Sequence, residues 1–320
     1  MYLVFDVGGT FIKYAYMSSD GDILKKDKIK TPDPRYSRPA DFVETIGTIY
    51  DKCTADENVE GIAVAMPGQI DVERGIVYGG GALPYLHEAH VQSMLEERCG
   101  GVKVSLENDG KAAALAEVWK GNAADVKDAY VLIFGTGIGG AVIKDRHVHV
   151  GKHLLAGEVS FSIDMLKFED VDKVVPIEGM GVVESFEKVP YFWSSHASTT
   201  ALCHRYAKLK GLDHEQVTGE MIYRFLDEGD EDAERVLEEM YFNIAKHCLN
   251  LYVAFDPEII LIGGGISAEP RFIEGIKKYV ERIRVISQIY KDFKIDLCKF
   301  RNDSNLFGAL FNFKQKYGLE

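Results

Sequence analysis

The residues best suited to chemistry lie in two glycine-rich turns. The first is Asp6-Val7-Gly8-Gly9-Thr10, and the second is Phe134-Gly135-Thr136-Gly137-Ile138-Gly139-Gly140. Glycine lets the backbone approach a phosphate closely, threonine adds a hydroxyl donor, and aspartate can order the hydrated magnesium ion that accompanies ATP. Each turn separates two stretches that alternate apolar and polar residues, as strands do. Two phosphate-type hairpins in one chain indicate a nucleotide site far more specifically than one does.

A dinucleotide site is disfavoured, because it needs a helix directly after its glycines. Here Phe11 to Met17 follows the first turn and has the period of a strand. A third cluster, Gly263-Gly264-Gly265, lies between a buried strand and the start of a helix. Close packing against a flat nucleoside and a tight connection are both consistent with that position.

Glu107-Asn108-Asp109 falls where a strand ends and a helix begins. An Asn or Asp in that place is often only an N-cap. Phosphoryl transfer to an alcohol, however, needs a carboxylate that accepts the hydroxyl proton and a neighbour that orients the sugar, and Asp109 and Asn108 supply both. Gly157-Glu158 offers a further carboxylate that can grip two adjacent sugar hydroxyls, although a lone glutamate is usually solvated.

Three histidines, His147, His149 and His153, are spaced as HxHxxxH and could be mistaken for a metal site. No nearby cysteine or helical HExxH motif supports zinc, so no metal site is predicted. The five cysteines are odd in number and widely scattered, which predicts ordinary thiols rather than disulfides.

Composition limits the class of partner. The 320 residues carry a net charge of −13, which argues against binding to nucleic acid or to an anionic membrane. No stretch approaches the roughly 20 apolar residues that span a bilayer, and the first residues lack a basic secretory leader. We therefore expect a cytoplasmic protein. We also expect two packed lobes, because 320 residues of which 46% are hydrophobic can form one large or two medium cores.

The elements that must position these residues alternate between strands and helices. Strands are predicted at 2–6, 11–17, 23–30, 61–66, 102–106, 130–134, 141–144 and 258–262. Helices are predicted at 40–52, 88–98, 109–119, 199–210, 220–227, 232–254, 270–282 and 305–316. The irregular region between 161 and 198 predicts an insertion or a long loop. Because the strand, glycine turn, strand pattern occurs once in each half, duplicated lobes around a cleft are expected.

Taken jointly, these motifs resemble the sugar kinases of the ROK (repressor, open reading frame, kinase) family. The resemblance covers essentially the whole chain and includes Ala65-Met66-Pro67-Gly68 and Ala156-Gly157-Glu158. It implies an α/β fold of the two-lobed actin-like ATPase (ribonuclease H-like) type, with mixed sheets and a central cleft. We expect a smaller N-terminal lobe of 1–118 plus 300–320 and a larger C-terminal lobe of 119–299. Family members often form homodimers.

The resemblance also implies residue roles. Asp109 is expected to be the general base. A second group is expected to bind or approach the sugar: Asn108, Glu158, Gly68, Gly81 and Ala82. A third group is expected to bind ATP, with Mg²⁺ carried by the nucleotide near Asp6: Asp6, Gly8, Gly9, Thr10, Lys13, Thr136, Gly137, Gly139, Gly264 and Gly265.

The chain departs from the common family pattern at three places. Phe161 stands where the family has a histidine, and Val175 to Val183 has none of the cysteines of the family's zinc motif, so structural zinc is not expected. A later sugar-binding glutamate corresponds to Ser194, or to Glu184 under another alignment. This zinc-less variant looks most like the bacterial β-glucoside kinase branch, in which an apolar face at Phe161 would leave room for an aglycone or a second sugar ring.

The sequence therefore predicts transfer of the ATP γ-phosphoryl group to a sugar hydroxyl, at the 6-hydroxyl of a glucosyl unit in a β-glucoside such as cellobiose. Glucokinase and N-acetylmannosamine kinase activities stay open, because the specificity loops are irregular. A sugar-responsive repressor would carry a helix-turn-helix extension before the first hairpin, whereas this chain starts on a strand. A non-catalytic sugar sensor is opposed by the presence of Asn108 and Asp109.

Overall fold

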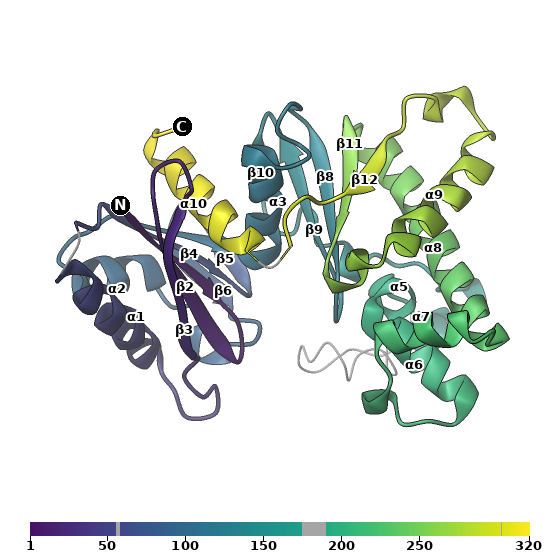
Figure 1. Ribbon diagram of the computed structural model, residues 1–320, viewed down its shortest axis with the longest axis horizontal. Coiled ribbons are helices and arrows are strands. Elements are labelled where there is room, and N and C mark those ends of the chain that lie inside the picture. Colours follow the sequence, from purple (N-terminus) through teal and green to yellow (C-terminus); the bar gives the residue numbers. More distant parts are fainter. Residues whose placement is uncertain (56–57, 175–189, 302) are drawn as a thin grey trace. The chain divides into compact units, whose positions relative to one another are not determined.

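The computed structural model describes residues 1–55, 58–174, 190–301 and 303–320. The chain forms two compact units, which are treated separately below (Figure 1). Unit 1 comprises Met1–Asp125, Gly151–Leu154 and Asn302–Glu320. Unit 2 comprises Val126–Val150 and Leu155–Arg301. None of the helices that the structure describes is both long and apolar enough to cross a membrane.

Unit 1 is built on a five-stranded mixed sheet of order β3-β2-β1-β4-β7. Strands β1 (Tyr2–Val7), β2 (Phe11–Met17) and β3 (Ile23–Lys30) are antiparallel neighbours. Strands β4 (Gly61–Met66) and β7 (Val104–Asn108) continue the sheet in parallel to β1. The predicted hairpin around the first glycine turn is therefore confirmed.

Helices cover both faces of this sheet (Figure 1). Because successive strand residues point to opposite faces, Leu3 and Phe5 of β1 pack with α1 (Pro39–Thr54) and α2 (Val91–Arg98). Tyr2 and Val4 belong to the core on the other face, which α3 (Asp109–Lys120) and α10 (Ser304–Tyr317) cover. The C-terminal helix thus packs in unit 1, although its residues are the last in the chain.

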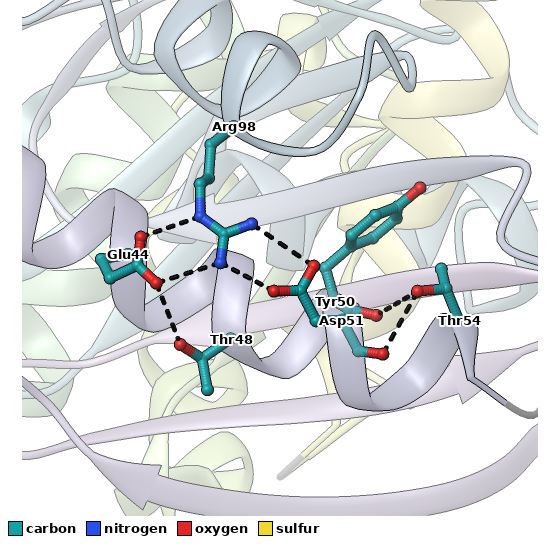
Figure 2. A network of polar contacts seen from close by, with 6 residues as sticks. All are labelled: Glu44, Thr48, Tyr50, Asp51, Thr54 and Arg98. Atoms are coloured by element: carbon teal, nitrogen blue, oxygen red, sulfur yellow. Dashed lines mark hydrogen bonds and ion pairs between the residues drawn. The ribbon is translucent and has the colours of Figure 1, made fainter.

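An ion-pair network links α1 to α2 at the surface (Figure 2). Arg98 Nε donates to Glu44 Oε2 at 2.8 Å, and its Nη2 donates to Asp51 Oδ2 at 2.8 Å. A Cβ added at Gly47 would lie 2.7 Å from Arg98 Cγ, so the arginine lies directly over this helical glycine. Exposed ion pairs contribute little stability, so the network mainly fixes the register between the two helices.

Unit 2 repeats the sheet pattern of unit 1, in the order β10-β9-β8-β11-β12. The antiparallel strands are β8 (Ala129–Phe134), β9 (Ile138–Lys144) and β10 (His147–His149), and the parallel ones are β11 (Ile259–Gly263) and β12 (Ile295–Leu297). The predicted internal duplication is confirmed. One detail differs: β9 begins at Ile138, so Gly139 and Gly140 are strand residues and the second turn is shorter than expected.

The helices of unit 2 pack against the face of the sheet formed by Tyr130, Leu132 and Phe134. They are α5 (Ser194–Ala197), α6 (Thr199–Lys210), α7 (Gly219–Asp227), α8 (Glu231–Phe255) and α9 (Pro270–Arg284). Hydroxyl or carboxylate caps begin α6, α7 and α8, since Ser198, Thr218 and Asp230 each accept a hydrogen bond from a first-turn amide.

Short elements escaped sequence prediction. They are the hairpin of β5 (Gln69–Asp71) and β6 (Ile76–Gly79), the strands β10 and β12, and short 3-10 turns at Pro84–Leu86, Val159–Phe161, Phe168–Lys173, His214–Gln216, Gly265–Ala268 and Gln288–Tyr290. Runs of three to six residues are too short to show a clear periodicity. The second predicted helix begins at Val91 rather than at Glu88, because Glu88 has a positive φ of 57° that no helix contains.

Candidate active site and family

The first glycine turn is held from outside the hairpin by Thr31. The Thr31 hydroxyl donates to the Gly8 carbonyl at 2.7 Å, and the Thr31 amide donates to the Thr10 carbonyl at 3.0 Å. Thr31 is buried, whereas Gly9 and Thr10 are exposed. Hydrogen bonds from Thr31 thus fix the turn, while Gly9 and Thr10 face solvent. A turn that binds phosphate through its backbone needs this exposure. Sequence reading missed Thr31, because nothing in its local pattern marks it.

Asp6 lies at the end of β1 with both carboxylate oxygens engaged. Its cross-strand partner Lys13 places Nζ 2.9 Å from Asp6 Oδ2. Asn305 of α10 donates from Nδ2 to Asp6 Oδ1 at 2.9 Å. The C-terminal helix therefore orients the aspartate of the N-terminal turn, a contact between residues nearly the whole chain apart.

Asn108 and Asp109 stand at the junction of β7 and α3, as predicted. Asn108 is the N-cap, since its Oδ1 accepts from the Lys111 amide at 3.1 Å, while its Nδ2 donates to the Gly68 carbonyl at 2.9 Å. Asp109 Oδ1 accepts from the Gly110 amide at 2.8 Å. Burial raises the pKa of Asp109, and the negative charge of Asp6 raises it further. A raised pKa makes a carboxylate a stronger base near neutral pH.

The loops expected near the sugar depend on glycine. Gly68 has a φ of 113°, and a Cβ there would lie 2.0 Å from the Gly79 carbonyl oxygen. Gly81 has a φ of 55° and packs against the backbone of Gly68. A Cβ on Gly9 would lie 3.1 Å from the Cβ of Ala82. Unit 1 therefore brings the Gly68 and Ala82 loops up to the first glycine turn and to Asn108.

Two charged residues that sequence reading passed over are buried beside Asn108. Glu107 is 2% exposed and Lys111 is 1% exposed. Glu107 Oε1 accepts from the Asn108 amide at 2.8 Å, and Lys111 Nζ donates to the Leu154 carbonyl at 3.4 Å. Burial raises the pKa of Glu107 to about 7, despite the opposing effects of the Asn108 amide and the positive charge of Lys111.

This raised pKa predicts a pH-dependent stability. Because the folded pKa of about 7 lies above the ordinary 4.5, protonated Glu107 stabilises the fold below pH 4.5, and this contribution is lost as pH rises through 7. The variant Glu107→Gln removes the titration. Relative to the natural protein, its free energy of unfolding should rise by about 3 kcal/mol between pH 4 and pH 8. Urea denaturation across that range measures it, and a pH-independent difference would contradict it.

In unit 2 the second glycine turn adjoins the third glycine cluster. Gly264 has a φ of 98°, and a Cβ there would lie 2.0 Å from the Phe134 carbonyl oxygen. A Cβ at Gly135 or at Gly265, in contrast, would have nothing within 4 Å. The Gly135 carbonyl accepts from the Thr199 amide at 3.0 Å, which fixes the start of α6 at the turn. Open space at glycines whose neighbours are fixed suits close approach by a ligand.

Glu158 follows Gly157, whose φ is 91°. A Cβ on Gly140 of β9 would lie 2.2 Å from the Gly157 carbonyl oxygen, so the Glu158 turn rests directly on the strand that leaves the second glycine turn. Glu158 itself is partly buried. Gly140 therefore serves packing, in addition to any contact with a nucleotide.

The residues after Glu158 include the three departures from the family pattern. Phe161 is 50% exposed and packs edge-to-face on Phe192, with ring centroids 5.6 Å apart. Ser194 is buried, and its hydroxyl donates to the Ser160 carbonyl at 2.9 Å. This hydrogen bond fixes the backbone between Glu158 and Phe161. Glu184 and the stretch 175–183 lie outside the described residues.

The three histidines of the HxHxxxH spacing do not form a metal-binding cluster among the described residues. His147 and His149 lie exposed on β10, and His153 is exposed in the segment that belongs to unit 1. In the part of the chain that the structure describes, no group of three or more His, Cys, Asp and Glu side chains could hold a metal ion.

The predicted site residues fall into two sets. Unit 1 holds Asp6, Gly8, Gly9, Thr10, Lys13, Gly68, Gly81, Ala82, Asn108 and Asp109. Unit 2 holds Thr136, Gly137, Gly139, Glu158, Gly264 and Gly265. Each set is brought together by glycine turns at the ends of one sheet.

The chain is similar to known proteins over nearly its whole length. The sequence model of the ROK family matches residues 2–165 and 191–316. A β-glucoside kinase of Klebsiella pneumoniae is 30% identical over 314 residues, which are 98% of this chain and 96% of that protein. The crystal structure of a ROK family protein from Streptococcus pneumoniae TIGR4 in complex with sucrose is 30% identical, with a TM-score of 0.82 over 99% of this chain and 100% of that one.

The fold is shared more widely. A ROK hexokinase from Thermus thermophilus, 23% identical, superimposes with a TM-score of 0.79 over 99% of both chains. The α/β fold of the actin-like ATPase type is thereby confirmed, with the two mixed sheets described above. The segment 166–190 that the family model leaves unmatched falls within the predicted insertion. The chain therefore belongs to the ROK family, as one of its carbohydrate kinases.

Proposed function

We propose that the protein transfers the γ-phosphoryl group of ATP to the 6-hydroxyl of a glucosyl unit in a β-glucoside such as cellobiose. The observation that carries this proposal is full-length similarity to β-glucoside kinases: those of Klebsiella pneumoniae and Listeria monocytogenes are each 30% identical over 98% of this chain. Asn108 and Asp109 in unit 1, and Glu158 in unit 2, are the groups to which we assign roles in this reaction.

Asp109 is the proposed general base. It removes the proton of the sugar hydroxyl as the oxygen attacks the γ-phosphorus, and its raised pKa suits that task. Asn108 orients the sugar from the same junction, because its side chain is fixed between the Lys111 amide and the Gly68 carbonyl. Glu158 is proposed to bind two adjacent sugar hydroxyls.

The residues present also suit ATP with Mg²⁺. Exposed Gly9 and Thr10 in one turn, and the open space at Gly135 and Gly265 in the other unit, permit close backbone approach to phosphates and nucleoside. Asp6, whose carboxylate is held by Asn305 and Lys13, is the residue proposed to order the magnesium hydration shell. We further propose that the protein acts in the cytoplasm, where ATP is plentiful, and that it forms a homodimer.

A second sugar ring is the feature that distinguishes this substrate class. Half-exposed Phe161, supported by Phe192, presents an aromatic surface three residues after Glu158. Aromatic rings are common in sites that bind ligands with an apolar face. The Streptococcus pneumoniae relative was crystallised with sucrose, which has two rings.

The variant Phe161→Ala tests this contact. Loss of one aromatic contact should lower kcat/KM for cellobiose about ten-fold, while kcat/KM for glucose changes less than about two-fold. Phe168→Ala is the matched control, since Phe168 is 93% exposed and its ring stands in solvent on the same segment. Steady-state kinetics with both sugars decide the matter. Equal losses on both sugars would show that Phe161 does not contact the second ring.

The proposed function itself is tested by measuring ADP release with ATP and Mg²⁺ against cellobiose, gentiobiose, an aryl β-glucoside, glucose, N-acetylmannosamine, N-acetylglucosamine and fructose. Preference for the β-linked glucosides supports the proposal. Preference for a monosaccharide overturns the substrate. A glucokinase of Halalkalibacterium halodurans is 26% identical and an N-acetyl-D-glucosamine kinase of Vibrio cholerae is 27% identical, each over most of the chain, so these activities are the second candidates.

A further inference from the structure

A buried polar cluster in unit 2 has no part in the roles assigned so far. At its centre is Asp164, whose side chain is only 4% exposed. Three neighbours on one face of α8 surround its carboxylate: Lys246 Nζ at 2.7 Å, Asn243 Nδ2 at 2.8 Å and His247 Nε2 at 2.9 Å. Residues three and four positions apart lie on the same side of a helix, so all three side chains can contact the one carboxylate of Asp164.

The cluster continues to the end of β8 through Trp193. The Trp193 indole is fully buried and donates from Nε1 to Asn243 Oδ1 at 2.7 Å. Its ring stacks on His247, with centroids 4.4 Å apart, and meets Phe134 edge-on at 6.1 Å. Phe134 is the last residue of β8, directly before the second glycine turn.

The same cluster holds the segment that carries Glu158. The Asp164 amide donates to the Tyr191 carbonyl at 2.8 Å, and the Trp193 amide donates to the Ser162 carbonyl at 2.8 Å. An isolated antiparallel bridge joins Ile163 to Phe192, the residue that supports Phe161. Segment 158–164 is thus joined by its backbone to residues 191–193, and by Asp164 to α8.

Burial of apolar side chains supplies only part of this attachment, because Val159 packs in the core of unit 2 but the apolar residues after it do not. Phe161 is 50% exposed, Ile163 is 58% exposed and Met165 is 48% exposed, so alternate residues of the segment face solvent. Burial alone would raise the pKa of Asp164, but hydrogen bonds from Lys246 and Asn243 outweigh it and lower the pKa to about 2. The carboxylate is therefore charged at any working pH, and removing the charge leaves its partners uncompensated.

We propose that Asp164 is a positioning residue for the sugar. By joining segment 158–164 to α8, it fixes Glu158 and Phe161 in one orientation, and this inference rests on the proposed function for the identity of the bound sugar. A buried network of ion pairs and hydrogen bonds around one carboxylate favours one geometry, whereas apolar contacts of similar strength tolerate several. The proposed sugar contacts of Glu158 and Phe161 thus depend on the carboxylate of Asp164, which does not itself contact the sugar.

The test compares Asp164→Asn with Asp230→Asn. Asp230 is a matched control in unit 2: it caps α8, accepts from Tyr206 Oη at 2.9 Å, pairs with Lys210 at 2.9 Å and also has a pKa of about 2, but it contacts no residue of segment 158–164 among the contacts described. We expect Asp164→Asn to raise KM for the sugar at least ten-fold, with kcat and KM for ATP changed less than three-fold. Asp230→Asn should leave all three nearly unchanged.

A second readout does not depend on turnover. Hydrogen exchange of the amides in 158–164, measured without sugar, should become at least ten-fold faster in Asp164→Asn and stay unchanged in Asp230→Asn. Sugar binding can be followed by the emission of Trp193 after Trp119→Phe, since the chain has two tryptophans. If Asp164→Asn fails to fold, Lys246→Gln, altered at a side chain that is 36% exposed, gives the same comparison in milder form.

Unchanged exchange in 158–164 would overturn the proposal, and so would faster exchange with an unchanged KM and affinity for the sugar. A natural protein that phosphorylates none of the sugars would overturn the proposed function instead. In that case the exchange experiment and binding followed by Trp193 would still decide whether Asp164 positions the segment.

Discussion

Replacing Asp109 by Asn is expected to lower kcat by about 1,000-fold, because general-base catalysis contributes roughly that factor. The substitution keeps the shape of the side chain and an oxygen that can still accept from the Gly110 amide, and Asn108 continues to cap α3. The fold and the sugar contacts should therefore remain. ADP release measures the loss of turnover, and isothermal calorimetry should show sugar affinity within about three-fold of the natural protein.

The pH profile gives a second check on Asp109. Only the ionised carboxylate accepts a proton, so kcat/KM should fall as pH falls through the pKa of Asp109. Burial and the charge of Asp6 raise that pKa above the ordinary 3.8, so the acid limb should lie at higher pH than for an exposed aspartate. The variant should lack this limb. Near-normal turnover by the variant would remove Asp109 from the mechanism.

Replacing Gly308 by Ala is expected to have the largest effect on stability. Gly308 lies in α10, and an added Cβ would be only 1.6 Å from the Ala112 carbonyl oxygen of α3. Neither backbone can yield unless the two helices move apart. Overpacking of this kind costs about 3 kcal/mol, well beyond the gain of roughly 1 kcal/mol from the better helix propensity of alanine.

Gly47→Ala is the matched control for Gly308→Ala. Gly47 is also a helical glycine, but the atoms nearest its added Cβ belong to the side chain of Arg98, which can change rotamer more easily than a backbone can move. Chemical denaturation should show a net loss of about 2 kcal/mol for Gly308→Ala and a change under about 1 kcal/mol for Gly47→Ala. Equal effects in the two variants would mean that α3 and α10 can separate at little cost.

The Gly308 contact also links stability to the site. Helix α3 begins at Asp109, and α10 supplies Asn305 to Asp6. Helices α3 and α10 therefore help to position Asp6 and Asp109, the two carboxylates of the proposed mechanism. A Gly308→Ala protein that still folds should show reduced kcat, because small displacements of a base are costly to proton transfer.

Local patterns determined much of this protein from the sequence. Both glycine hairpins, the N-cap at Asn108 and the α6 helix of Thr199–Lys210 were predictable, because turn glycines, capping side chains and periodicity act within a few residues of chain. The motifs likewise sufficed to predict the family, since a phosphate-binding turn depends on residue types at fixed local spacing.

Tertiary structure alone decided which distant residues support those motifs. Thr31 holds the first turn, Asn305 orients Asp6, and Gly308 lets α10 touch α3, yet none of these positions carries a local signal. Glu107 and Asp164 read as ordinary charged residues in the sequence. They become buried groups with shifted pKa values only because strands and helices far apart in the chain close around them, and burial of a charge is set by the packed core rather than by its neighbours in sequence.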